Sequence, residues 1–459
     1  MLNQSVARAV IAEALKTGGD FAEIFLEDRL NHNLSMLSGK VENVNSLRLH
    51  GAGVRVLSGV RGVYVYTNDT SEAGLLACAR RAADAISAQT SVTAAPLMLR
   101  ETPNVHPIRE MPDRVRQARK IEKMKAAQAV LAATPEIVQA SVGYMDSVQR
   151  VLIANSEGLF TTDTRVYTRF VCSAIASNGT ENQTGFDGPG AMQGFEIFDQ
   201  RIDPEQSAKT AAKMAVTMLH APVCPAGVMP VVIDNGFGGV IFHEACGHSL
   251  EATSVAPGNS EFCGKLGQKV ASDKVTAIDD GTMPNEWGSE NIDDEGTPTA
   301  RLVLIENGVL KNYMVDRFNA RRMHMPVTGS GRRQGYMFAP TSRMRNTYIA
   351  AGDDDNDEII TSMGDGLYAK VMGGGSVEPA TGKFNFAVNE GYLVRGGKIA
   401  HPVRGASLIG RGSEILPLID RVGRDMQMAQ GMCGSLSGSV PTNVGQPMIR
   451  VSSMTVGGR

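Results

Sequence analysis

Short segments in which apolar and polar residues alternate recur along most of this chain. Near the N-terminus they are residues 21–28, 47–57 and 60–67. The later ones are residues 301–310, 366–377, 384–394 and 446–458. A period of two places successive side chains on opposite faces of a strand. Because the 50 glycines also provide many turns, the pattern predicts an α+β fold rich in antiparallel sheet. We expect the N-terminal sheet to have one solvated face.

A domain boundary is predicted near residue 221. The pattern predicts a helix over residues 204–220, and the next segment, APVCPAGVMP, cannot continue it because it carries three prolines. Residues 1–220 are therefore expected to form an N-terminal α+β domain, in which long helices accompany an antiparallel sheet. Residues 221–459 are expected to form a mainly antiparallel, barrel-like β-rich domain.

Composition excludes several kinds of partner. Lys and Arg number 45 against 48 Asp and Glu, so no basic excess is present to neutralise a nucleic acid, and we expect no such partner. The longest uncharged run, residues 221–233, falls short of the roughly 20 residues that a membrane span requires. The six cysteines are irregularly spaced, which indicates reduced thiols or metal ligands and a cytoplasmic location.

The segment IFHEACGHSLE brings His243, Glu244 and His248 together between apolar residues. In zinc hydrolases, imidazoles bind the metal, and a neighbouring carboxylate takes a proton from the activated water. These residue types therefore indicate metal-dependent hydrolysis on a helix of the C-terminal domain. The alternative is a helix that only packs, in which the three residues occur together by chance.

The spacing of the two histidines requires a distorted helix. His248 follows His243 by five residues, which on a regular α-helix places it about 140° around the axis. Both rings could then not reach one ion. A π-bulge, with its wider i→i+5 turn, would return them to one face, and we expect Gly247 to lower the steric barrier to that distortion.

A third ligand decides between the two interpretations, because a catalytic zinc ion usually has three protein ligands and a water. Four residues are eligible by chemistry: Cys246, Glu251, Cys263 and Cys433. Cys246 is expected to point away from the metal face, and Glu251 could either bind the metal or orient a ligand. Spacing alone does not choose among them.

The string HEACGHSLE resembles the HEAxGHxLE segment of catalytic members of the TldD/PmbA family of metalloproteases. Further similar segments occur in the same order. They are DDEGTPTARLVLIENGVLKNYMVDRFNARRM, GRRQGYMFAPTSRMRNTYIAAGD, EGYLVRGGKIAHPVRGASLIG and GMCGSLSGSVPTNVGQPMIRVSSMTVGG. The resemblance is strong through the whole C-terminal half and covers the general layout of the N-terminal half.

The resemblance implies a site and an activity. It implies that His243, His248 and Cys433 bind zinc and that Glu244 is the general base of a peptidase acting on unfolded or short peptides. It also implies a dimer, either of two copies or with an inactive paralogue of the PmbA (TldE) type. Two other functions stay open: a non-catalytic regulatory protein of the gyrase-modulator type, and a zinc hydrolase of a non-peptide amide.

Two further features have both a functional and a structural interpretation. The glycines of VMGGGSV, residues 371–377, could let an extended peptide pair with a strand edge, or they could form a bulge or tight turn. A set of arginines could bind a substrate carboxylate or phosphate, although scattered arginines more often form surface or interface ion pairs. These arginines are Arg317, Arg321, Arg322, Arg332 and Arg333.

Overall fold

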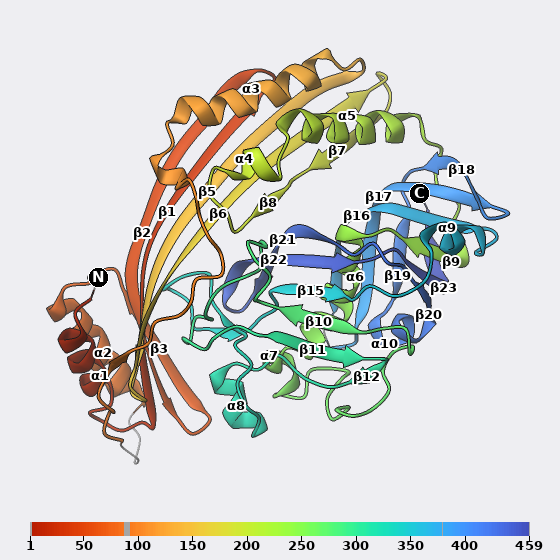
Figure 1. The fold of residues 1–459 in the computed structure, drawn as a ribbon. Coiled ribbons are helices and arrows are strands. Elements are labelled where there is room, and N and C mark those ends of the chain that lie inside the picture. The colour runs from red at the N-terminus through yellow and green to blue at the C-terminus, as the bar shows by residue number, and fades with distance from the viewer. Residues whose placement is uncertain (1, 87–91, 379, 459) are drawn as a thin grey trace.

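The structure, a computed structural model, describes residues 2–86, 92–378 and 380–458. Figure 1 shows a long curved sheet from the N-terminal half arching over a β-rich C-terminal half. The strands of the curved sheet are β1 (Phe21–Leu37), β2 (Lys40–Ser58), β3 (Arg61–Thr67), β4 (Met98–Leu99), β5 (Ile137–Asn155), β6 (Leu159–Ser177), β7 (Asn182–Asp187) and β8 (Gly190–Ala191). Their order is β3-β2-β1-β5-β6-β4, and β7 and β8 also pair with β6.

Helices cover one side of this sheet. They are α1 (Gln4–Ala14), α2 (Glu72–Ile86), α3 (Gln117–Ala133), α4 (Ile197–Gln200) and α5 (Pro204–His220). The helices α1 and α2 pack together at one end, while α3 and α5 lie along the convex face (Figure 1). The limits of α5 are those predicted from the sequence, because Asp203 caps its first turn and the prolines that follow His220 cannot continue it.

The sheet is buried on both faces at the end where β1 begins. This differs from the prediction that one face of the sheet is solvated. In β1, every residue from Phe21 to Glu27 is buried. Ile24 packs in the cluster beneath α1 and α2, whereas Phe25 points the other way and packs with Ile292 and Tyr336 of the C-terminal half. The C-terminal half therefore covers the face that the alternating pattern left to solvent.

The C-terminal half contains a closed barrel. Its sheet comprises β9 (Gly227–Ile233), β16 (Gly366–Glu378), β17 (Lys383–Arg395), β18 (Lys398–Val403), β19 (Ser407–Arg411), β20 (Ile419–Val422) and β23 (Ile449–Gly457). The path β16-β9-β23-β19-β17 is closed by the pairing of β16 with β17. The α+β class and the barrel-like C-terminal half are therefore confirmed.

A second, open sheet adjoins the barrel. Its strands are β10 (Ala277–Asp280), β11 (Arg301–Glu306), β12 (Val309–Leu310), β15 (Asn346–Ile349), β21 (Gln427–Ser435) and β22 (Gly438–Gln446), in the order β12-β11-β10-β15-β22-β21. The strands β13 (Gly331–Arg332) and β14 (Thr341–Ser342) form a separate pair, and the short helices are α7 (Ala252–Val255), α8 (Arg317–Met323), α9 (Asn356–Thr361) and α10 (Gly412–Ile415). The strand β21 lies at the edge of the open sheet.

The glycines of β16 form a bulge. The pairing of β16 with β17 shifts in register between Met372 and Gly375. A Cβ atom at Gly375 would lie 2.3 Å from the carbonyl oxygen of Asn385, so the bulge requires glycine there. This confirms the structural interpretation of the glycine run. Across the described residues, none of the helices combines the length and apolar character needed to cross a membrane.

Candidate metal centre

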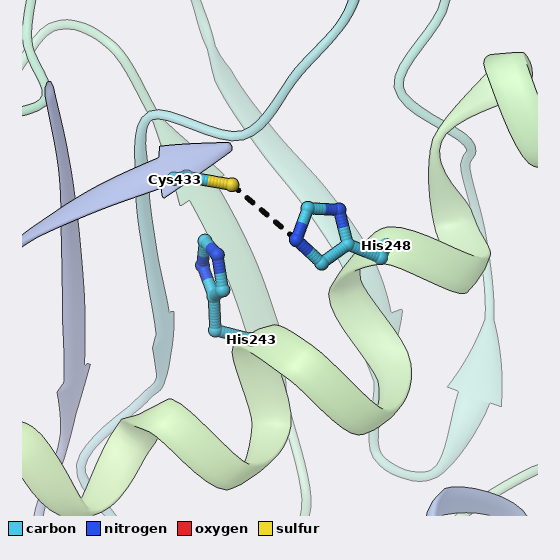
Figure 2. Close-up of side chains that lie close together, drawn as sticks. All are labelled: His243, His248 and Cys433. Atoms are coloured by element: carbon cyan, nitrogen blue, oxygen red, sulfur yellow. Dashed lines mark hydrogen bonds between the residues drawn. The ribbon is translucent and has the colours of Figure 1, made fainter. Parts of the chain in front are cut away.

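The segment after β9 is a helix whose hydrogen bonding changes along its length. It begins as a 3-10 turn (Gly236–Gly239) and continues as α6 (Val240–Phe242). The next stretch, His243–Gly247, is a π-helical turn in which the His248 N–H donates to the carbonyl oxygen of His243. This i→i+5 bond confirms the predicted widening of the helix. Figure 2 shows the two imidazoles on the same side of it.

Gly247 packs closely against a neighbouring side chain at the π-turn. Its φ of −56° and ψ of −52° are ordinary helical values. A Cβ atom at this position would lie 2.2 Å from Sδ of Met344. The glycine therefore leaves room for a neighbouring side chain, whereas its backbone dihedrals are open to any residue.

Cys433 meets the two histidines from a distant part of the chain. It lies on β21, and its Sγ is 3.3 Å from Nε2 of His248 (Figure 2). One possible ligand atom from each of His243, His248 and Cys433 lies within 4.8 Å of the other two. The two imidazole centroids are 5.1 Å apart, and the ring planes cross at 81°. In the described part of the chain, no other group of three such side chains could hold a metal ion.

The donor set fits a zinc ion. His243 is 3% exposed, and its Nδ1 has no hydrogen-bond partner among the described residues. An unpartnered buried polar atom costs free energy, which a bound ligand would recover. Two imidazole nitrogens and a thiolate are donors that zinc prefers, and three protein ligands leave a position for water or substrate.

Electrostatics favour the thiolate form of Cys433. Burial alone would raise the pKa of this thiol, but the charges and hydrogen bonds of His243 and His248 outweigh burial and lower the pKa to about 3. Burial likewise opposes the charged form of His248, yet Glu251 and Cys433 raise the pKa of that imidazole well above its ordinary value. Because the thiolate is the form of cysteine that binds metals, Cys433 is ready to act as a ligand.

Two carboxylates adjoin His248. Oε2 of Glu251 lies 3.1 Å from Nδ1 of His248, and Oε1 of Glu251 accepts a hydrogen bond of 3.3 Å from the Met344 N–H. These bonds hold the imidazole with Nε2 toward Cys433, so Glu251 orients the ring. The side chain of Glu244 is 30% exposed, and its Oε2 lies 3.7 Å from Nε2 of His248. Glu244 is therefore accessible from outside the cluster.

The remaining candidate thiols lie apart from the cluster. Cys246 is 1% exposed and packs in the main apolar core of the C-terminal half. This agrees with the prediction that it points away from the metal face. Cys263 is partly exposed, and its Sγ lies 3.5 Å from the carbonyl oxygen of Val255. Of the four residues eligible as a third ligand, only Cys433 approaches both histidines.

Three of the five candidate arginines form ion pairs with the N-terminal half. Nη2 of Arg333 lies 2.8 Å from Oε1 of Glu23, and Nη1 of Arg317 lies 2.8 Å from Oε2 of Glu157. Arg321 pairs with Asp20, again across the two halves. Arg332 pairs with Glu290 inside the C-terminal half, and Arg322 donates to Asn319. The structural interpretation of these arginines as interface ion pairs holds for three of the five.

A cavity along β21 was not predicted. It has a volume of about 480 Å³ and is bounded by the β21 residues immediately before Cys433, by the β16 bulge and by the curved sheet. Residues on its wall include Arg169, Phe186, Phe237, Met372, Gln430 and Met432. Because these residues come from distant stretches of sequence, no local pattern marks them.

The sequence matches three domain models of one family. Residues 22–86 match domain 1 of the PmbA/TldA metallopeptidases, residues 110–219 match the central domain, and residues 226–458 match the C-terminal domain. Together these matches cover most of the chain, including the helix and the strand that carry the cluster.

Named relatives and solved structures agree with this match. The chain is 34% identical to a metalloprotease TldD homologue of Buchnera aphidicola and 35% identical to one of Haemophilus influenzae, in each case over 96% of this chain and 93% of the relative. A Thermotoga maritima structure described as a modulator of DNA gyrase superposes with a TM-score of 0.81 at 21% identity, over 99% of this chain and 100% of that one. The structure of TldE from Thermococcus kodakarensis superposes with a TM-score of 0.77 at 18% identity, over 98% of this chain and 99% of that one. This chain therefore belongs to the TldD/PmbA family of metalloproteases.

Proposed function

We propose that this protein is a zinc-dependent peptidase that hydrolyses unfolded or short peptides. In this proposal His243, His248 and Cys433 bind the zinc ion, and Glu244 is the general base. The observation that carries it is the meeting of two imidazoles and one thiolate, all within 4.8 Å, at a π-helical turn. The relatives named as metalloproteases support the reaction class.

Each side chain of the site has its own role in the proposed hydrolysis. When bound, zinc would activate a water molecule and polarise the peptide carbonyl. Glu244 would accept the proton of the attacking water and deliver it to the leaving amine, which its partly exposed carboxylate near His248 allows. Glu251 would keep the His248 ring in place through its bond to Nδ1. Because a thiolate ligand reduces the effective charge of the metal, the reaction would depend strongly on Glu244.

The edge strand β21 supports an extended peptide as the substrate. It pairs with β22 on one side, and on its other side the described residues provide no strand partner. Main-chain hydrogen bonds to such an edge recognise extended backbone rather than a particular side chain. Most of the backbone of a folded protein is already hydrogen-bonded internally, so unfolded or short peptides fit best.

The assembly and location belong to the same proposal. Membership of the TldD/PmbA family favours a dimer, formed by two copies or with a PmbA/TldE-like paralogue. The six cysteines are all free, which favours a reducing compartment such as the cytoplasm.

Metal analysis and peptide cleavage test the proposal together. We expect about one zinc ion per chain, loss of most of it in Cys433→Ala, and normal zinc in the matched control Cys263→Ala, whose thiol lies outside the cluster. Glu244→Gln should keep the zinc and lose cleavage of an unfolded peptide by at least 100-fold. Full cleavage by Glu244→Gln would contradict the assigned base, and full zinc binding by Cys433→Ala would contradict the ligand set.

A substrate panel separates the remaining functions. Peptides of graded length should be cleaved, whereas non-peptide amides should not. A protein that binds zinc but cleaves only non-peptide amides would refute the peptidase assignment. A biological effect that survives Glu244→Gln unchanged would point to a regulatory protein instead.

A further inference from the structure

Arg169 on β6 is a charged residue at the wall of the cavity beside β21. Its Nε donates to the carbonyl oxygen of Gly188 at 3.1 Å, and its Nη2 donates to the carbonyl oxygen of Gln430 at 3.3 Å. Its guanidinium carbon lies 5.6 Å from the ring centroid of Trp287. The strands β21 and β22 lie beneath the arch to which β6 belongs (Figure 1). Arg169 is therefore fixed next to the edge strand.

Arg169 differs from the other interior arginines in lacking an anion. Arg165, Arg333 and Arg345 each lie within 4 Å of a carboxylate oxygen. No carboxylate of the described residues lies within that distance of Arg169, whose Nη1 also has no hydrogen-bond partner among them. Asp187 adjoins the same cavity but makes no ion pair with Arg169.

Arg169 is thus a partly buried cation without a counterion. Desolvation lowers the pKa of the Arg169 guanidinium, and no neighbouring charge opposes that effect. A guanidinium has five N–H donors in a planar fork. Two of them are used here, one at Nε and one at Nη2, so those left at Nη1 and Nη2 can donate to a carboxylate. The cavity of about 480 Å³ offers space for such an anion.

The point where Arg169 contacts β21 can be related to the position of Cys433 on the same strand. Gln430, which accepts the Arg169 hydrogen bond, precedes Cys433 by three residues on the same strand. At about 3.3 Å per residue, this separation is roughly 10 Å. An extended peptide that lay along β21 would span it with about three residues.

We propose that Arg169 binds a carboxylate of the peptide substrate and thereby sets the position of cleavage. The inference rests on the proposed peptidase function of the same site. The carboxylate is either the C-terminal α-carboxylate or an acidic side chain, bound roughly two or three residues from the bond to be cleaved. With the α-carboxylate bound, the enzyme releases di- and tripeptides from the C-terminus. Arg169 is then a determinant of specificity and takes no part in bond cleavage.

Binding can be measured without catalysis, because the chain has a single tryptophan, Trp287, next to Arg169. The zinc-loaded Glu244→Gln protein is titrated with an unlabelled peptide that lacks tryptophan and acidic residues, in free-acid and C-terminally amidated forms. We expect the free acid to bind about 10-fold to 100-fold more tightly, as for a charge-assisted hydrogen bond. In Glu244→Gln/Arg169→Gln, both forms should bind equally weakly.

An amidated peptide with one glutamate distinguishes the two sources of the carboxylate. If placing this glutamate near the C-terminus restores tight binding, Arg169 recognises a side-chain carboxylate as well; if it does not, Arg169 recognises the chain end. A matched control is Arg404→Gln, because Arg404 also donates to a carbonyl oxygen, that of Ala221, but pairs with Glu181. It should keep the preference for the free acid.

Several outcomes overturn the inference. The inference is refuted if the Glu244→Gln protein, in which Arg169 is intact, binds three peptides equally well. These are the free acid, the amidated peptide and the amidated peptide with one glutamate. A preference for the free acid that survives Arg169→Gln also refutes it and leaves Arg169 as a structural tie between β6 and β21. If Arg169→Gln fails to fold, Arg169→Lys should reduce the preference while retaining a charge. Failure of the peptidase proposal appears separately, as absence of cleavage by the wild-type protein.

Discussion

At the scale of single residues, two residues outside the His243–His248–Cys433 cluster shape its surroundings. Gly247 allows Met344 to approach the π-turn, and Glu251 connects the imidazole of His248 to the Met344 backbone. Together they fix where His248 points. Each can be changed without altering a donor atom of the cluster.

Replacing Gly247 by alanine should destabilise the protein. The new Cβ would lie 2.2 Å from Sδ of Met344, and overpacking of this kind costs about 1–3 kcal/mol. Urea denaturation measures the loss, and Met344→Ala in the same chain should recover part of it. Gly374→Ala is the control, since nothing lies within 4 Å of its Cβ position. A Gly247→Ala protein as stable as the wild type would show that Met344 moves aside freely.

Removing the Glu251 carboxylate should weaken zinc binding while leaving all three donors present. Loss of a residue that orients a metal-binding histidine typically lowers affinity by about 10-fold to 100-fold, so Glu251→Ala should show this loss in competition with a chelating dye. Glu251→Gln should lose less, because its amide oxygen can still accept from Nδ1 of His248. The exposed Glu414→Gln serves as the control. Unchanged affinity in folded Glu251→Ala would assign Glu251 a purely structural role.

At the scale of elements, local sequence rules account well for the helices and for the metal-site turn. The limits of α5 follow from the cap at Asp203 and from the prolines after His220. The π-turn at His243–Gly247 follows from the need to bring histidines five residues apart onto one face. In both cases the relevant interactions lie within one helix, where sequence spacing fixes the geometry.

The cap of α5 gives a direct test at this scale. The side chain of Asp203 accepts hydrogen bonds from the N–H groups of Glu205 at 2.9 Å and Gln206 at 3.3 Å. Asp203→Ala should therefore lower the free energy of unfolding by about 1 kcal/mol, whereas Asp203→Asn, which retains a capping oxygen, should change it little. Thermal unfolding measures both. Equal losses in the two variants would show that the negative charge, rather than the cap, matters.

At the scale of the whole molecule, buried ion pairs join the curved sheet to the C-terminal half. Arg165 of β6 lies 2.7 Å from Asp294 and 3.2 Å from Glu290. Arg333 reaches Glu23 of β1 from the other direction. All five residues are almost completely buried. Because a broken pair would leave an uncompensated buried charge, these contacts fix one relative position of the two halves.

This network predicts a dependence of stability on pH. Burial would raise the pKa of Glu290, but Arg165, Arg332 and Arg345 outweigh burial and lower it from 4.5 to about 2. A carboxylate with a lowered pKa stabilises the folded state above its unfolded pKa, and that stability is lost as the pH falls from about 4.5 toward 2. Glu290→Gln should be less stable at pH 7 by about 3–5 kcal/mol and should lose less stability over that range.

Circular dichroism across this pH range measures the effect. The exposed Glu306→Gln is the matched control, since its partner Lys311 is also exposed, and it should follow the wild-type curve. A Glu290→Gln protein whose stability falls with pH as steeply as that of the wild type would assign the acid sensitivity to other carboxylates.

The sequence by itself determined the features that repeat along the chain. Its alternating strands predicted the α+β class, and HEACGHSLE predicted both the histidine pair and the π-turn that unites it. These predictions succeeded because backbone periodicity and hydrogen bonding within one helix depend on residues a few positions apart. Spacing could not select Cys433 among the eligible third donors, and only the family resemblance named it.

The tertiary structure alone decided what meets across long separations. Cys433 approaches His248 over 185 residues because β21 lies at the edge of the open sheet, a position set by the strand order. The contact of Gly247 with Met344, the uncompensated charge of Arg169 and the burial of both faces of β1 have the same origin. Such contacts depend on how distant elements pack against one another, and the local periodicity of a sequence does not encode that packing.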